Sequence, residues 1–394
     1  MRILNICAYT WAIGGPARVI YDHTSIAVQR GHQVDILSPM SPGDKLYPVP
    51  EGARVIPVLR TPPLSLFFRE YSTPLYHYLK KHIHEYDIIH CHGIWHFGSI
   101  APFLLNKSVA KVVTLHGLLD KWALRNSYWK KKLLSIVLQK RLLNRADLIQ
   151  LYNTDELADL SRYLGHQHPN AVLIPNGIPM ADFETLPDSG TFRQQHGIPD
   201  SQPIILFMSR LNIKKGLDLL LPAFKKYAER HADALLVLAG PDDGYRATAE
   251  AFIRDNNLTS RVKLVGMLID DNKKAALADA SVFILPSYSE GFSIAVLEAM
   301  ASGTATIVSD RVGFGDVIRE TGAACLTDLT PESILASLEK VMQNDTYREQ
   351  LGTTGQELVR RQYDIQVVAD QLLNAYQLVL NHRRAVKGTP LPVA

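Results

Sequence analysis

The sequence is poor in cysteine and in net charge. Among 394 residues there are three cysteines, Cys7, Cys91 and Cys325, which lie far apart and form no Cys-x-x-Cys pair. This excludes a disulfide framework and a zinc cluster, and it indicates a reducing compartment. The 42 basic and 39 acidic side chains leave a net charge of +3, too little to indicate nucleic acid as a partner.

Long apolar runs are also missing. No stretch reaches the 18 or so apolar residues that a membrane-spanning helix needs. The start, MRILNICAYTWAIGG, lacks a basic segment followed by a long apolar one, so we expect a cytoplasmic protein that is neither secreted nor integral to a membrane. With 46% hydrophobic and 21% charged residues, the chain has the composition of a soluble globular protein of two or three domains.

Short β-branched runs alternate with helical patterns over most of the chain, which is typical of parallel sheets covered by helices. The first half contains the strand segments RILNICAY, VDILSP, RVIPVL, YDIIHCH, KVVTLH, DLIQLY and AVLIPN. The second half contains PIILFMSRL, ALLVLAG, VKLVG, SVFILPS and ATIVSD. The pattern predicts an α/β protein with two Rossmann-like doubly wound domains in tandem.

The domain boundaries follow from this repeat. We assign residues 1–185 to an N-terminal domain and residues 200–364 to a C-terminal domain. The segment from about 180 to 203 is rich in proline and glycine and has no sustained period, so it is predicted to be the linker. A last helical pattern over 365–382 is expected to pack back on the N-terminal domain.

The first strand runs into Gly14, Gly15 and Pro16. Two glycines allow a tight turn, and proline suits the start of a helix whose N-terminus could face an anion. Any short strand-to-helix loop uses the same residues, so phosphate binding and a purely structural turn are both open.

The second domain opens with a basic loop, Ser209-Arg-Leu-Asn-Ile-Lys-Lys-Gly216, directly after an apolar strand. Arg210 and Lys215 would lie at the carboxyl end of this strand, where a planar guanidinium and an ammonium suit a diphosphate. The alternative is a pair of solvated basic residues.

The sharpest motif is PSYSEGFSIAVLEAMASG over 286–303, with Glu290 and Glu298 eight residues apart. If a helix begins just after Gly291, the two carboxylates are separated by about 12 Å along its axis, enough to reach two ends of a nucleotide sugar. The amides of 292–294 would then be free donors in the first turn. A glutamate within IAVLEAMA needs a hydroxyl or a cation as partner; we expect a ligand, and the alternative is a buried ion pair.

These motifs together resemble the family 4 glycosyltransferases, which are retaining enzymes of the GT-B fold. The resemblance rests on the Glu-x7-Glu segment ending in EAMASG, the Arg-Leu and Lys-Gly turn, ADASVFILPS, IPNGI and the N-terminal double glycine. It runs from residue 1 to about residue 380. It implies two Rossmann-like domains that face each other across a cleft.

The resemblance also implies roles in binding a nucleoside diphosphate sugar, linked to UDP or GDP. Arg210 and Lys215 would bind the diphosphate, Glu298 the ribose and Glu290 a hydroxyl of the transferred sugar. The other residues expected to contact the sugar nucleotide are Gly15 and the segment 265–268, whose Met267 would contact the nucleobase. The backbone at Gly291, Phe292, Ser293 and Ile294 would contact the sugar and the phosphate. The sequence departs from the family at Pro179, where aspartate is frequent, and at Ser293, where glycine is common.

His116 follows the strand KVVTLH and would face the transferred sugar from the first domain. The resemblance makes His116, Glu290, Arg210 and Lys215 the catalytic set. A histidine at a strand end can also be purely structural, but the carboxyl end of a parallel strand is where doubly wound folds bind ligands.

No metal site is expected. His90, His92 and His96 lie close in sequence, but no acidic or cysteine partner follows at a ligating distance. The pairs Asp242-Asp243 and Asp270-Asp271 lack the Asp-x-Asp spacing of metal-dependent transferases. We therefore predict no essential metal and no cofactor beyond the sugar nucleotide.

A basic and apolar segment stands out over 121–145, with eight basic residues and no acidic one. It is suited to peripheral contact with an anionic membrane surface. Its apolar positions spread around the helix, so a helix packed on the sheet with solvated lysines fits equally. The loop 63–71, with Leu64, Leu66, Phe67 and Phe68, is a second apolar candidate in the half that would bind the acceptor.

The sequence thus predicts transfer of a hexose, with retention, to a hydroxyl of a glycan or lipid-linked saccharide, in surface polysaccharide or glycolipid synthesis at the inner face of the membrane. Two other classes stay open. A sugar-nucleotide epimerase of the same architecture would convert its donor without an acceptor, and a non-catalytic nucleotide-sugar binding subunit would not need His116.

Overall fold

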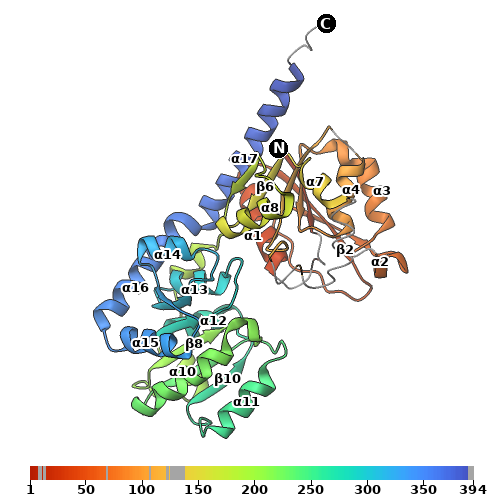
Figure 1. Ribbon diagram of the computed structural model, residues 1–394. Coiled ribbons are helices and arrows are strands. Elements are labelled where there is room, and N and C mark those ends of the chain that lie inside the picture. The colour runs from red at the N-terminus through yellow and green to blue at the C-terminus, as the bar shows by residue number, and fades with distance from the viewer. Residues whose placement is uncertain are drawn as a thin grey trace. The chain divides into compact units, whose positions relative to one another are not determined.

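The computed structural model describes residues 1–7, 11, 15–67, 70–105, 108–120, 124 and 138–388. The chain divides into two compact units (Figure 1). Unit 1 comprises Met1–Gly177 and Ile365–Ala394, and unit 2 comprises Ile178–Asp364.

Unit 1 contains a parallel sheet of seven strands in the order β3-β2-β1-β4-β5-β6-β7. The strands are β1 (Arg2–Cys7), β2 (Gln33–Met40), β3 (Arg54–Leu59), β4 (Ile88–His92), β5 (Ala110–Thr114), β6 (Leu148–Leu151) and β7 (Ala171–Leu173). The helices are α1 (Gly15–Gln29), α2 (Leu64–Phe67), α3 (Thr73–His82), η1 (Ile83–Glu85), α4 (Phe97–Leu105), α7 (Lys140–Leu143), α8 (Thr154–Leu164) and α17 (Ile365–Gly388).

Helices cover both faces of this sheet because its central strands are apolar on both sides. Along β1, Leu4 and Ile6 join the core formed with α3 and α4, whereas Ile3 joins the core formed with α1 and α17. This period of two places consecutive side chains on opposite faces. The sheet is therefore doubly wound.

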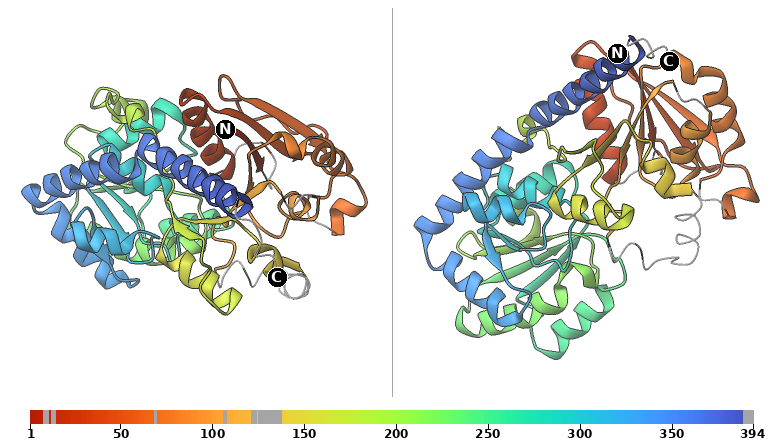
Figure 2. Two further views of the ribbon diagram at one scale, coloured as in Figure 1. Left: turned by 90° about the horizontal axis from the view of Figure 1, so that it is seen from above. Right: turned by 45° about the horizontal axis from the view of Figure 1, so that its top comes forward.

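The C-terminal helix α17 belongs to unit 1. Its apolar stripe is buried against α1 and the sheet through Val368, Leu372, Leu373, Tyr376 and Val379. Arg383 pairs with Asp147 at 2.5 Å beyond this stripe. Figures 1 and 2 show α17, in blue, beside the red N-terminal elements, so the two ends of the chain share one core.

Unit 2 contains a parallel sheet of six strands in the order β10-β9-β8-β11-β12-β13. The strands are β8 (Ile204–Met208), β9 (Leu235–Ala239), β10 (Val262–Gly266), β11 (Val282–Leu285), β12 (Thr306–Ser309) and β13 (Cys325–Thr327). The main helices are α10 (Leu217–Arg230), α11 (Arg246–Asp255), α12 (Asp270–Asp279), α13 (Ile294–Ala301), α14 (Gly315–Thr321), α15 (Pro331–Met342) and α16 (Asp345–Leu358). Shorter turns are η3 (Met180–Phe183), α9 (Thr191–His196), η4 (Ile213–Lys215) and the π-helix η5 (Val359–Tyr363).

Two predictions about unit 2 need correction. The segment predicted to be a linker, about 180–203, belongs to unit 2, because Met180, Phe183 and Phe192 are buried in its core. Residues 178–185, assigned to the first domain by sequence, therefore start the second unit. Strand β13 was not predicted, since three residues are too few to show an alternating pattern.

No helix among the described residues is both long and apolar enough to cross a membrane.

Candidate donor site in unit 2 and the histidine cluster of unit 1

Strands β8 and β11 are adjacent in the middle of the sheet of unit 2, at the point where the strand order reverses. Ligands of doubly wound sheets bind outside the carboxyl ends of the strands at such a point. Arg210 and Lys215 follow β8, and Glu290 follows β11. The structure therefore brings these three predicted site residues to one edge of one sheet.

Glycine is required where the loops at this edge touch. A Cβ atom at Gly216 would lie 2.0 Å from the carbonyl oxygen of Pro286, and φ is +74° there. A Cβ at Gly240, at the end of β9, would lie 1.8 Å from the carbonyl oxygen of Ser209. The loop that carries Arg210 and Lys215 therefore packs so closely against the neighbouring loops that a side chain at either glycine would clash with the backbone.

Three ion pairs lie at the ends of these strands. Lys215 pairs with Glu290, and both side chains are about 10% exposed. Lys273 of α12 pairs with Glu298 at 2.5 Å. Arg210, which is 62% exposed, pairs with Asp243 at 2.5 Å. The members of these pairs are the four predicted cations and carboxylates together with Lys273 and Asp243.

Glu290 is held in place by more than its cation. Ser287 donates its hydroxyl to Glu290 Oε1 at 3.1 Å, and the Glu290 amide donates to the Arg311 carbonyl oxygen at 2.9 Å. Ser287 is itself buried and accepts the Ser309 hydroxyl at its carbonyl oxygen at 2.6 Å. The carboxylate therefore has a fixed orientation.

Glu298 has the ion-pair partner that the sequence analysis considered as the alternative. The partner is Lys273, and the carboxylate stays 14% exposed. This ion pair does not exclude a ligand, because a carboxylate has about four lone-pair positions and can accept a hydrogen bond from a ligand hydroxyl while it stays paired with Lys273.

Helix α13 begins at Ile294, two residues later than expected. Ser293 precedes the helix in an extended conformation, and Phe292 packs against Phe314 and Tyr363 with ring centroids 5.2 and 5.8 Å away. This aromatic anchor keeps the chain extended before the helix starts. The amides without intrahelical acceptors are consequently those of residues 293–296, which include Ser293 and Ile294 of the predicted set but not Phe292.

The remaining predicted donor contacts also lie in these loops. Gly291 is exposed just before α13, and Met267 is 58% exposed just after β10. In unit 1, Gly15 is the first residue of α1, which follows β1. Gly14 lies outside the described residues.

His116 lies at the carboxyl end of β5 in unit 1, with a left-handed backbone at φ +53°, followed by Gly117 at φ +71°. Its Nδ1 atom is 2.8 Å from the Tyr152 hydroxyl, and its Nε2 atom is 3.3 Å from His92 Nδ1. Burial, and secondarily the nearby His23, lower the pKa of His116 to about 3. The ring is therefore neutral at physiological pH.

The neighbouring histidines are bound to other protein groups. His90 makes hydrogen bonds of 2.6 Å to Tyr376 and to Thr114, and its ring contacts the ring of His92, with centroids 4.0 Å apart and the planes tilted by 32°. Among the described residues, no group of three or more histidine, cysteine, aspartate or glutamate side chains is arranged to hold a metal ion. The absence of an essential metal stays a prediction.

The acidic pairs flagged in the sequence have local partners. Asp242 accepts the amides of Gly244 and Arg246 at 2.9 and 3.1 Å, and Asp271 pairs with Lys274. Sequence reasoning missed Lys273 and Asp243 as site residues. Lys273 lies on α12 and Asp243 lies in the loop after β9, and only the fold brings them opposite Glu298 and Arg210.

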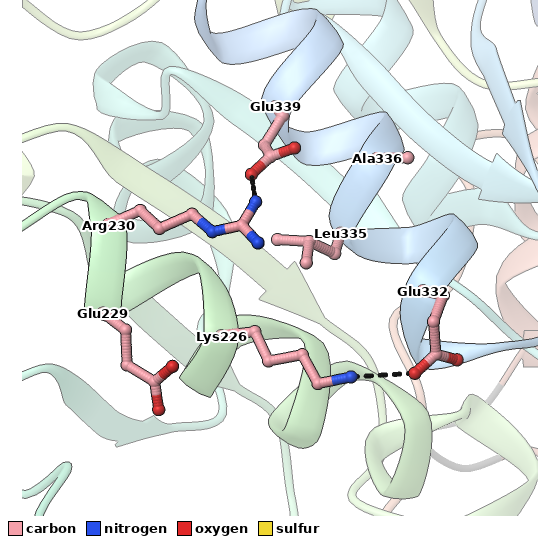
Figure 3. Close-up of a pocket in the computed structure, with 7 residues that line it drawn as sticks. All are labelled: Lys226, Glu229, Arg230, Glu332, Leu335, Ala336 and Glu339. Carbon is pink, nitrogen blue, oxygen red and sulfur yellow. Dashed lines mark hydrogen bonds and ion pairs between the residues drawn. The ribbon is translucent and has the colours of Figure 1, made fainter.

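A separate hollow of about 470 Å³ lies between α10 and α15 (Figure 3). Two ion pairs flank it, Lys226 with Glu332 at 2.8 Å and Arg230 with Glu339. No predicted site residue lines it. Its lining residues are Lys226, Glu229, Arg230, Glu332, Leu335, Ala336 and Glu339.

The predicted membrane-contact segment, 121–145, lies largely outside the described residues. Its described end includes α7, where Leu142 and Leu143 are buried in the core of unit 1. In the loop 63–71, Leu64 is 50% exposed, whereas Phe68 lies outside the described residues.

Two family models match the chain. Residues 13–182 match the model described as Glycosyltransferase Family 4, and residues 188–358 match the model described as Glycosyl transferases group 1. The phosphatidyl-myo-inositol mannosyltransferase of Mycobacterium tuberculosis is 27% identical over 401 aligned positions, which cover 96% of this chain and 97% of that protein.

Solved structures show the same architecture. Sucrose-phosphate synthase from Thermosynechococcus elongatus superposes with a TM-score of 0.79 at 22% identity, covering 97% of this chain and 99% of that one. Alr3699/HepE from Anabaena, solved in complex with UDP-glucose, gives a TM-score of 0.75 at 19% identity, covering 96% of this chain and all of that one, 100%. Because both halves match glycosyltransferase models and both sheets have the Rossmann-like order, the chain belongs to the family 4 glycosyltransferases of the two-domain GT-B fold.

Proposed function

We propose that this glycosyltransferase moves a hexose from a nucleoside diphosphate sugar to a hydroxyl of a glycan or lipid-linked saccharide, with retention at the anomeric carbon. The observation that carries the proposal is the set of ion pairs at the carboxyl edge of unit 2. Three cations, Arg210, Lys215 and Lys273, are each held opposite a carboxylate at this edge. Such paired groups can exchange partners with the phosphates and hydroxyls of a sugar nucleotide.

Each group has a role that suits its surroundings. Arg210 is exposed and can turn from Asp243 to a diphosphate, which its planar guanidinium fits. Lys215 is nearly buried and adds a fixed positive charge, while the first-turn amides of α13 add donors aimed at an anion. Glu290 would bind a hydroxyl of the sugar and Glu298 the ribose.

The transfer step follows from these groups. The acceptor oxygen bonds to the anomeric carbon as the bond from that carbon to the diphosphate oxygen breaks, and the acceptor proton passes to the departing phosphate oxygen on the same face. No protein nucleophile is required. Arg210, Lys215 and the start of α13 then stabilise charge on the leaving diphosphate, and His116 faces the transferred sugar.

We further propose a UDP- or GDP-linked donor, no essential metal, and a lipid-linked acceptor in polysaccharide or glycolipid synthesis. The name of the mycobacterial relative specifies a lipid acceptor, and the solved HepE complex contains UDP-glucose. The basic and apolar segment 121–145 suits an anionic membrane surface, so we place the reaction in the cytoplasm, at the inner face of the membrane.

Calorimetric titration of UDP, GDP and ADP tests the donor site. We expect one nucleotide to bind wild type, and Glu298→Ala to weaken it about 10- to 100-fold by removing a charged hydrogen-bond partner. Glu339→Ala is the matched control, because it removes a glutamate from an ion pair in the same unit but outside the site. If no nucleotide binds to folded wild type, the proposal is wrong.

Retention is tested on the product. The anomeric configuration of the transferred sugar, read from its proton coupling by NMR, should equal that of the donor. An inverted product would refute the mechanism and leave the donor site standing.

A further inference from the structure

A chain of polar side chains runs from the carboxyl edge of the sheet of unit 1 into its core. It starts at Tyr152, directly after β6, whose hydroxyl is 2.8 Å from His116 Nδ1. It continues from His116 Nε2 to His92 Nδ1 at 3.3 Å, and from His92 Nε2 to Asn5 Oδ1 at 3.3 Å. Asn5 then donates its amide group to Thr24 Oγ1 at 3.2 Å.

The donor and acceptor of every hydrogen bond in this chain follow from the orientation of the Asn5 amide, whose nitrogen donates to Thr24. Burial lowers the pKa of His92 far below its usual range, so both His92 and His116 are neutral and each has one donor and one acceptor nitrogen. Asn5 Oδ1 can only accept, so His92 Nε2 donates to it and His92 Nδ1 accepts. His116 must therefore carry its proton on Nε2, and its Nδ1 accepts the hydroxyl proton of Tyr152.

The backbone on either side of this chain is braced by one carboxylate. Glu156, at the start of α8, accepts the Gly117 amide at 2.5 Å and the Tyr152 amide at 2.7 Å. It thereby ties the left-handed turn at His116 to the end of β6. The ring of His116 and the hydroxyl of Tyr152 are held against each other by both backbone and side chain.

We propose that Tyr152 and His92 are positioning residues that fix the tautomer and the ring orientation of His116. This inference rests on the proposed function, in which His116 faces the transferred sugar. In this arrangement both ring nitrogens of His116 are bound within unit 1, Nδ1 by the Tyr152 hydroxyl and Nε2 by His92, so the neutral ring is held in one orientation. Neither Tyr152 nor His92 needs to touch the sugar.

The tautomer can be measured without any transfer reaction. In the full-length protein labelled with ¹⁵N-histidine, NMR should show His116 with a protonated Nε2 and an unprotonated Nδ1. Tyr152→Phe should shift the Nδ1 signal by removing its donor. Tyr376→Phe is the matched control: it removes an equally buried hydroxyl from His90 at 2.6 Å and should leave the His116 signals in place. A wild-type proton on Nδ1 would overturn the inference.

Turnover tests the positioning role. Tyr152→Phe should lower kcat about fivefold, the value of roughly one hydrogen bond, with donor KM changed less than about twofold. His92→Gln keeps an oxygen that can accept and should retain more turnover than His92→Leu. Equal losses in the two His92 variants, or an unchanged kcat in Tyr152→Phe, would overturn the role. Full turnover in His116→Ala would instead refute the assignment of His116, and the tautomer measurement would still stand.

Discussion

The Lys215 and Glu290 pair offers a way to separate the stability of the donor site from its chemistry. We expect Lys215→Ala to lower both the stability of unit 2 and the rate of transfer. The double variant Lys215→Met with Glu290→Gln should recover most of the stability and none of the rate. The two effects have different causes, and the structure gives a size for each.

The stability effect comes from the charge left behind. The Lys215 and Glu290 side chains are 10% and 11% exposed, so removal of the ammonium group leaves a nearly buried carboxylate without its counter-charge. Breaking a buried pair in this way costs about 3–5 kcal/mol, and we expect the lower end because the Ser287 hydroxyl still donates to Glu290. Replacing both members with uncharged groups of similar size should cost about 1 kcal/mol or less.

The rate effect comes from the lost positive charge at the leaving diphosphate. Removing one preorganised electrostatic group from an active site costs about 10²- to 10³-fold in kcat. The assays are urea unfolding and donor turnover on wild type, the single variant and the double variant. The reasoning is refuted if the double variant is no more stable than Lys215→Ala, or if it transfers sugar at the wild-type rate.

Three further predictions concern other parts of the protein. Gly216→Ala should destabilise unit 2 by at least about 2 kcal/mol in urea unfolding, because its Cβ would meet a carbonyl oxygen 2.0 Å away. Gly244→Ala is the control: φ is +89° there but the space around it is open, so the loss of stability should be only about 1 kcal/mol. Equal losses of stability in the two variants would contradict the packing argument. Burial raises the pKa of Glu156 from 4.5 to about 7, so the native state is favoured below pH 4.5 and loses that advantage as the pH rises through 7. The free energy of unfolding should therefore be measured for wild type and Glu156→Gln at pH 5 and pH 8. Relative to wild type, the variant should be more stable at pH 8 than at pH 5 by up to about 3 kcal/mol, and a difference between the two proteins that is the same at both pH values would argue against the raised pKa. Asp243→Asn should tighten nucleotide binding about two- to fivefold in calorimetry, because it releases Arg210 from an exposed ion pair, and weaker binding would show that the carboxylate helps the donor site.

Much of the fold could be predicted from the sequence. All seven strands of unit 1 and the strands β8 to β12 of unit 2 follow the predicted apolar segments, because parallel strands covered by helices are rich in apolar, β-branched residues over a short stretch of sequence. The prediction of a linker over about 180–203 was wrong because the burial of this segment depends on contacts with residues far away in the sequence. Its prolines and glycines mark turns, but Phe192 and its apolar neighbours are buried by contacts with distant strands that no local pattern shows.

Within the site, the sequence indicated Arg210, Lys215, Glu290 and Glu298, because each stands in a short motif beside a predicted strand or helix. The start of α13 was placed two residues early, since the aromatic contacts of Phe292 with residues far along the chain decide it.

The sequence by itself determined which residue types follow each strand, and through the parallel topology it determined which edge of each sheet they occupy. Only the tertiary structure decided their partners. Lys273 with Glu298, Asp243 with Arg210, and Tyr152 and His92 with His116 are pairs separated by 24 to 36 residues. Hydrogen bonds and ion pairs act over a few ångströms, so such partners become visible only after the backbone has brought their loops together.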